Sequence, residues 1–179
     1  NVQVIIDEAN RLTTLVNDVL DLSKLQGGAM SMDPQPYNLT SSVTDTLSRY
    51  QKLTEQKGYT LNFRHGEDAW VNADQVKIEQ VLYNLINNAI TYTGADKTVA
   101  VDQRIRDGWV SIRVTDAVEG VPEEDVPYIW DRYYKSSQAH RRAEVGTGLG
   151  LSIVRSILEL HGARFGVKSP PGKGASFWF

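Results

Sequence analysis

The sequence contains no cysteine and only three histidines among its 179 residues. The absence of cysteine excludes disulfides and thiolate metal sites, and it is compatible with a reducing compartment. The histidines lie too far apart in the sequence for a zinc-binding spacing. No apolar run reaches the roughly 18 residues that a membrane-spanning helix needs. A net charge of −3 argues against a protein that binds nucleic acids nonspecifically.

The composition is otherwise that of an ordinary folded domain, with 41% hydrophobic and 23% charged residues. The length is enough for one domain of good size and an appendage. Residue 1 already lies in a helical pattern, and residues 175–179 end within an alternating pattern. We therefore expect the sequence to be a fragment of a longer chain, and its lack of a membrane span says little about the parent protein.

The most informative segment is the glycine-rich run at residues 146–154 (GTGLGLSIV). Glycine adopts positive φ angles at little cost and lets another group approach the backbone closely. Apolar residues at helical spacing follow at once, so the glycines are predicted to lie at the N-terminus of a helix. The free N–H groups and the dipole of such a helix favour a bound phosphate. Taken alone, the run is equally compatible with a glycine-rich turn between packed elements.

A second segment, residues 80–93, carries asparagines beside an apolar stripe of helical period. Asn84 and Asn88 are one helical turn apart and therefore share a face. An amide oxygen suits a hard cation such as Mg²⁺. The alternative is a structural role in capping or in hydrogen bonding between helices.

These segments belong to a series of motifs that occur in the same order in sensor histidine kinases. Residues 84–89 (NLINNA) resemble the N box of that family, and residues 146–154 resemble its G2 box. Residues 129–135 (IWDRYYK) are similar to the F box, with tryptophan and tyrosine where phenylalanines are usual. Residues 172–177 (GKGASF) resemble the last glycine box, and residues 161–162 match the end of the helix after G2. The series is far more specific than any one motif.

The resemblance implies the ATP-binding catalytic domain of a two-component sensor histidine kinase. The fold would be α+β, a two-layer α/β sandwich of the GHKL (Bergerat) ATPase type. It would have a mixed sheet with helices on one face, preceded by one long coiled-coil-like helix. The reaction would transfer the γ-phosphoryl group of Mg·ATP to a histidine absent from this chain, for relay to a response-regulator aspartate. The domain would be cytoplasmic, homodimeric through its N-terminal helix, and compatible with a membrane-anchored parent.

The resemblance also implies which residues bind the cofactors ATP and Mg²⁺. Asp116 is expected to accept a hydrogen bond from the adenine amino group, and Asn88 to ligate Mg²⁺ with Asn84 in support. The complete set expected at ATP is Asn84, Asn88, Tyr92, Asp116, Gly120, Lys135, Arg141, Arg142, Gly146, Thr147, Gly148, Leu149, Gly150 and Leu151. Each cation in this set could instead be an ordinary solvated loop charge. No residue of the chain is expected to be the phosphoacceptor or otherwise catalytic, and this includes His65, His140 and His161.

The adenine-binding motif departs from the family pattern Asp-Asn-Gly-x-Gly-Ile. Residues 116–121 read DAVEGV, so that Ala117 and Val118 replace the asparagine and the first glycine. Valine at a positive φ angle would be strained. Two alternatives therefore stay open. One is a degenerate kinase whose nucleotide pocket is regulatory or a scaffold, and the other is a different GHKL ATPase that drives conformational closure.

The pattern divides the chain into three parts. Residues 1–28 place apolar side chains at heptad a and d positions, which is compatible with a coiled-coil-like seam or with an amphipathic helix packed on its own domain. The resemblance implies that this segment is the second helix of the dimerisation hairpin. Residues 29–37 are predicted to be a linker, and residues 38–179 the catalytic domain. Within that domain the sequence predicts helices over residues 39–57, 80–93 and 122–130, and Asp74 can cap the second of them. It predicts strands over residues 59–63, 99–101, 109–115, 164–168 and 175–179. Residues 133–147 are predicted to be a lid.

Overall fold

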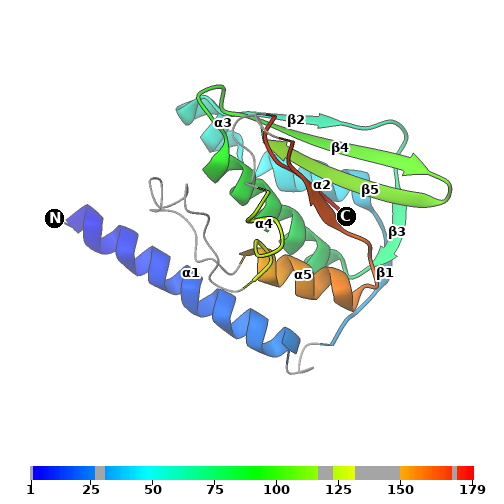
Figure 1. Ribbon diagram of the computed structural model, residues 1–179, viewed down its shortest axis with the longest axis horizontal. Coiled ribbons are helices and arrows are strands. Elements are labelled where there is room, and N and C mark those ends of the chain that lie inside the picture. The colour runs from blue at the N-terminus through cyan, green and yellow to red at the C-terminus, as the bar shows by residue number, and fades with distance from the viewer. Residues whose placement is uncertain (1, 27–30, 117–122, 132–149, 171–172) are drawn as a thin grey trace.

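The computed structural model describes residues 2–26, 31–116, 123–131, 150–170 and 173–179 (Figure 1). The helices are α1 (Val2–Gln26), α2 (Leu39–Ser48), α3 (Gln51–Lys57), α4 (Gln75–Tyr92) and α5 (Gly150–Leu160). The strands are β1 (Gln35–Asn38), β2 (Thr60–Arg64), β3 (Trp70–Ala73), β4 (Thr98–Arg106), β5 (Trp109–Asp116), β6 (Gly166–Lys168) and β7 (Ser176–Trp178).

A mixed five-stranded sheet forms the framework, in the order β2-β4-β5-β7-β6. Only β2 and β4 run parallel, whereas the other neighbours are antiparallel. Figure 1 shows α2, α4 and α5 gathered on one side of this sheet, with α1 lying beyond α5. The α+β class, the mixed sheet and the long N-terminal helix are therefore confirmed. A small antiparallel sheet of β1 and β3 was not predicted.

The core lies between the sheet and α4. Alternate side chains of β4 and β5 point inward, as the period of a strand requires, and meet one face of α4. The fully or almost fully buried members are Val99 and Val101 of β4, Ile112 and Val114 of β5, and Val81, Leu82, Leu85 and Ile86 of α4. Burying each such side chain contributes about 1.5–3 kcal/mol. The other faces of α4 are consequently held in a fixed orientation.

The turn between β4 and β5 follows its local sequence. Asp107 and Gly108 have φ angles of 53° and 76°, and Arg106 pairs with Trp109 across the turn. Positive φ at both central residues is the geometry that matches the twist of a two-residue hairpin, and Asp-Gly favours it. The predicted hairpin is confirmed, and both strands are longer than predicted.

The single helix predicted over 39–57 is wrong, because the chain breaks it into α2 and α3. At the break the N–H of Tyr50 donates to the carbonyl of Leu47, three residues back rather than four. The Tyr50 ring is buried against Tyr83, with centroids 5.8 Å apart, and its hydroxyl donates to Asn87 Oδ1 at 2.9 Å. Packing against α4 thus decides the backbone at a position where the helical pattern continues.

Two other segments differ from prediction. The predicted linker over 29–37 contains part of β1, where Pro36 is tolerated because the strand is at a sheet edge. Residues 123–130 form turns instead of the predicted helix. The N–H of Tyr128 donates to the carbonyl of Asp125, and the N–H of Asp131 donates to the carbonyl of Tyr128, each three residues back. The predicted lid over 133–147 lies outside the described residues.

The long helix α1 exposes much of its apolar side. Ile5, Leu12 and Val19, three of the heptad positions, are exposed, whereas Leu15 is half-buried and packs against the core. The helix contacts α5. Among the described residues, no helix is both long and apolar enough to cross a membrane. Dimerisation through α1, and the three-part division of the chain, remain predictions.

Candidate nucleotide site

Helix α4 carries the asparagines, and Asp74 fixes where this helix begins. Asp74 has an extended backbone, and its Oδ1 accepts the N–H of Lys77 at 3.2 Å. This is the geometry of an N-cap, in which a side-chain oxygen satisfies an N–H group that the first turn leaves unpaired. The predicted cap is confirmed.

Asn84 lies beside the first residue of α5. A Cβ built on Gly150 would be 3.9 Å from Cγ and Oδ1 of Asn84. The structure thus brings together residues from the two asparagine- and glycine-containing motifs. The amide nitrogen of Asn84 is buried and has no hydrogen-bond partner among the described residues. A buried donor without a partner costs about 1–3 kcal/mol, so a ligand at this place would relieve an existing cost.

Asn88 follows Asn84 by one turn and is half-buried. Its neighbour Asn87 has a structural role, because it accepts the Tyr50 hydroxyl. Among the described residues, no hydrogen bond engages the side chain of Asn88, which leaves its amide oxygen available to a cation. Tyr92 lies half-buried in the last turn of α4, and burial raises the pKa of its phenol, so it stays neutral.

Asp116 ends β5, and only 3% of its surface is exposed. Its Oδ1 accepts the N–H of Ala175 at 3.1 Å, and its own N–H donates to the Ala175 carbonyl at 3.0 Å. These two bonds to Ala175, in the last glycine motif, therefore fix Asp116 at the edge of the core. Helix α4 packs on both β5, which ends at Asp116, and α5, which begins at Gly150.

This donor set fits Mg·ATP. An amide oxygen on α4 suits Mg²⁺, a buried carboxylate can accept from an amino group, and the N-terminus of α5 favours phosphate oxygens. The amide nitrogen of Asn84, which has no partner within the described ranges, lies next to that terminus.

The sequence profile described as histidine kinase-, DNA gyrase B-, and HSP90-like ATPase matches residues 73–179. The chain belongs to this family. Within the family, its relatives are sensor kinases, and it contains the catalytic ATPase domain of a two-component sensor histidine kinase.

Three relatives illustrate the match. "Sensor protein SrrB" of Staphylococcus aureus (strain N315) is 30% identical over 97% of this chain, which corresponds to 30% of SrrB. Full-length ShkA in complex with AMPPNP superposes with a TM-score of 0.84 at 26% identity, over 99% of this chain and 37% of ShkA. ThkA in complex with the response regulator TrrA gives a TM-score of 0.79 at 25% identity, over 98% of this chain and 48% of that one. The chain spans less than a third of the length of SrrB.

The described part of the ATPase domain includes only some of the residues expected at ATP. Gly150 begins α5, and the half-buried Leu151 packs against the core. The expected residues that lie outside the described part are Gly120, Lys135, Arg141, Arg142, Gly146, Thr147, Gly148 and Leu149. Ala117 and Val118, the departures from the adenine motif, also lie outside it.

Trp130 holds the described end of the F-box motif onto the core of the ATPase domain. Its ring meets Phe165 and Phe177 edge to face, with centroids 5.3 and 5.7 Å away. Its carbonyl accepts the hydroxyl of Ser152, at 3.2 Å, from the first turn of α5. The sequence analysis did not single out Ser152, and the only signal for it is a polar residue on the buried face of that helix.

His161 is engaged at both ring nitrogens. Its Nδ1 donates to the Ile157 carbonyl at 2.8 Å, and its Nε2 accepts the N–H of Asp74 at 3.1 Å. These bonds join the end of α5 to the start of α4. His161 therefore forms a structural link that the sequence analysis missed, and its exclusion as the phosphoacceptor stays a prediction.

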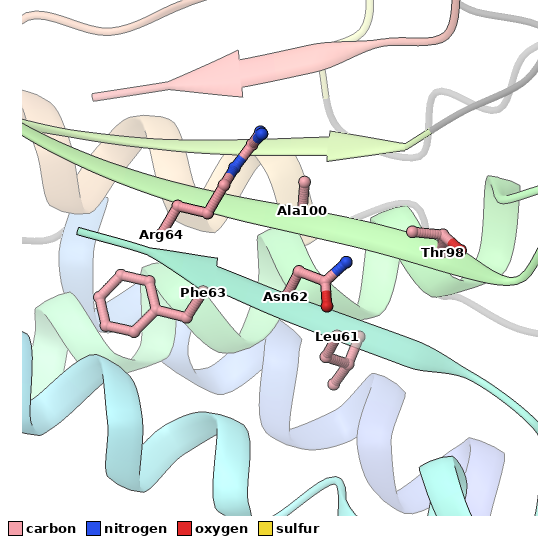
Figure 2. Close-up of a pocket in the computed structure, with 6 residues that line it drawn as sticks. All are labelled: Leu61, Asn62, Phe63, Arg64, Thr98 and Ala100. Carbon is pink, nitrogen blue, oxygen red and sulfur yellow. The ribbon is translucent and has the colours of Figure 1, made fainter.

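A separate hollow of about 530 Å³ lies at β2 and β4, lined by Leu61, Asn62, Phe63, Arg64, Thr98 and Ala100 (Figure 2). Figure 2 shows Asn62 and Arg64 pointing away from the side of β2 that carries Leu61 and Phe63. The lining residues come from the edge strand β2 and its neighbour β4. None of its lining residues is expected at ATP, so it is not the candidate nucleotide site.

Proposed function

We propose that this domain transfers the γ-phosphoryl group of Mg·ATP to a histidine outside the present chain, for relay to a response-regulator aspartate. The observation that carries the proposal is the buried amide nitrogen of Asn84, which has no hydrogen-bond partner in the part of the chain that the structure describes and lies beside Gly150, the first residue of α5. The Asn84 side chain would thus offer a hydrogen-bond donor beside the backbone N–H groups that the G2 motif would present to phosphate.

Each described residue has a distinct part in the proposal. Asp116 accepts from the adenine amino group, Asn84 donates to a phosphate oxygen, and Asn88 ligates Mg²⁺, with Tyr92 at the nucleotide. Bound Mg²⁺ would neutralise phosphate charge, and the protein would position the nucleotide, as phosphoryl transfer generally requires. Gly120, Lys135, Arg141, Arg142 and the glycines of the G2 motif complete the proposed set.

One relative supports a response regulator as the partner. ThkA forms a complex with a response regulator, and we infer that the parent of this chain acts on one too. Homodimerisation would use the exposed heptad side of α1. The domain would work in the cytoplasm, and the parent protein is compatible with a membrane sensor.

Phosphoryl transfer is tested with labelled ATP. The present chain should stay unlabelled, because the proposed acceptor is not part of it. A longer chain that includes the preceding hairpin helix should acquire an acid-labile, base-stable phosphohistidine. Labelling of the present chain at His65, His140 or His161 would contradict the proposal, as would an unlabelled longer chain that binds ATP.

The metal site is tested by Asn88→Ala. Removing the amide oxygen should lower ATP affinity about tenfold in Mg²⁺ but less than about twofold in EDTA, because only the metal-dependent part of the binding is lost. Calorimetric titration with a nonhydrolysable ATP analogue measures both values. Asn62→Ala, at an exposed asparagine on β2, is the matched control and should change neither. Equal losses in both buffers would remove Asn88 from the metal site.

A further inference from the structure

The start of α4 is joined to the segment that follows α1. Lys77 Nζ donates to Asp74 Oδ2 at 2.9 Å and to the Ser31 carbonyl at 3.0 Å. The N–H of Asp33 donates to the same Asp74 oxygen, at 3.0 Å. The side chains of Lys77 and Asp74 are only 10% and 7% exposed. The ion pair therefore lies between the segment Ser31–Asp33 and the first turn of α4.

Capping α4 does not by itself require this arrangement. The cap uses Oδ1 of Asp74 alone, whereas Oδ2 and the Lys77 ammonium bind backbone groups of another segment. Lysine is rarely buried unless it is paired, because removing its charge from water is costly. Asp74 Oδ2 and the Lys77 ammonium therefore hold residues 31–33 against the start of α4.

Asp74 also reaches α5. Its backbone N–H donates to Nε2 of His161, at the far end of the helix that begins with Gly150. Helix α5 in turn contacts α1. The Asp74–Lys77 pair consequently links the chain leaving α1 to both helices that carry the candidate nucleotide site (Figure 1).

We propose that Asp74 and Lys77 are positioning residues for phosphoryl transfer, which fix the orientation of α1 relative to the nucleotide site. This inference rests on the proposed function, because the acceptor histidine would lie on the hairpin that includes α1. A pair that holds α1 in one orientation sets where that histidine meets the γ-phosphate. Displacing reacting groups by about 1 Å can cost about a hundredfold in rate.

The orientation is measured without any reaction. Because the chain has no cysteine, Asn17→Cys on α1 and Ser111→Cys on β5 can carry two spin labels at exposed positions. Pulsed electron–electron resonance should give one narrow distance distribution. Lys77→Met, which keeps length but removes the ammonium, should broaden or shift it, and Lys77→Arg should restore it. An unchanged distribution in Lys77→Met would overturn the proposal.

The rate is measured in the longer chain that carries the acceptor. Lys77→Met should lower kcat for autophosphorylation about tenfold or more, with KM for ATP changed less than about twofold. Lys77→Arg should recover most of kcat. A raised KM with unchanged kcat would place Lys77 at the nucleotide and overturn the positioning role. ATP affinity of the present chain should be unaffected by Lys77→Met.

Arg155→Met is the matched control, because Arg155 forms an exposed ion pair with Glu159 within α5 alone. It should change neither distance nor rate. If Lys77→Met does not fold, the double variant Asp74→Asn, Lys77→Met repeats both measurements, since asparagine can still cap α4 and no unpaired charge is left buried. The distance measurement tests the positioning role even if the longer chain transfers no phosphoryl group. If the longer chain is an active kinase and Lys77→Met changes neither the distances nor kcat, the positioning role is refuted and the proposed function is not.

Discussion

Asp116→Asn is expected to lower the affinity for ATP about ten- to a hundredfold while the domain stays folded. The Ala175 N–H can still be accepted by the asparagine oxygen, so the link between β5 and the last glycine motif persists. The other side-chain atom becomes an NH₂ group, which cannot accept from the adenine amino group. A hydrogen bond to a charged group contributes about 1.5–3 kcal/mol, which gives this range. Calorimetric titration with a nonhydrolysable ATP analogue measures the loss.

Asp102→Asn is the control for Asp116→Asn. Asp102 pairs with Arg64 at the sheet surface, with N and O atoms 2.7 Å apart, and its replacement should leave ATP affinity within about twofold. If Asp116→Asn has no larger effect than this control, adenine does not bind at the end of β5.

The altered adenine motif can be tested in the same titration. Ala117→Asn combined with Val118→Gly restores the family pattern and should tighten binding, because an amide returns and a strained residue is removed. Tighter binding would favour the degenerate-kinase alternative for the natural chain. Unchanged affinity, together with a large loss in Asp116→Asn, would leave that alternative without its main support.

The sequence predicted those parts of the fold that local physics determines. The stripe of apolar residues on α4 has the helical period, and Asp74 supplies a cap where that stripe begins. Asp107 and Gly108 take the positive φ angles that their residue types tolerate. The juxtaposition of Asn84 and Gly150 could be expected only from the order of the motifs, since their spacing along the chain carries no distance information.

Contacts between distant segments account for what the sequence did not predict. The break at Tyr50 follows from its packing on Tyr83 and its bond to Asn87, and no residue at the break itself disfavours a helix strongly. The bond from Asp74 to His161 joins residues that are 87 positions apart. A histidine near a helix end has many local explanations, so its partner could be found only in the folded chain.

The ionisation of Asp74 gives the second large effect, on stability. Burial by itself would raise the pKa of this carboxyl group, but the N–H of Asp33 and the N–H and ammonium of Lys77 outweigh burial and lower it from 3.8 to about 2. A lowered pKa means that the folded chain binds this proton more weakly than the unfolded chain. The stabilisation is therefore complete above about pH 4 and is lost as the pH falls from there through about 2. The gap in pKa corresponds to about 2 kcal/mol.

Asp74→Asn should remove this pH dependence. At pH 7 the variant should be less stable by about 3–5 kcal/mol, because the nearly buried Lys77 ammonium loses its counter-charge. Between pH 5 and pH 2.5 the natural chain should lose about 1–2 kcal/mol more of its unfolding free energy than the variant does, since only the natural chain protonates Asp74. Urea unfolding at each pH measures both quantities, and Asp107→Asn, at an 88% exposed side chain, should follow the natural chain. Equal losses of unfolding free energy in the natural chain and in Asp74→Asn would show that Lys77 and Asp33 do not hold the carboxylate in its ionised form. A carboxylate that titrates alike in the folded and unfolded chains contributes nothing to the pH dependence of stability.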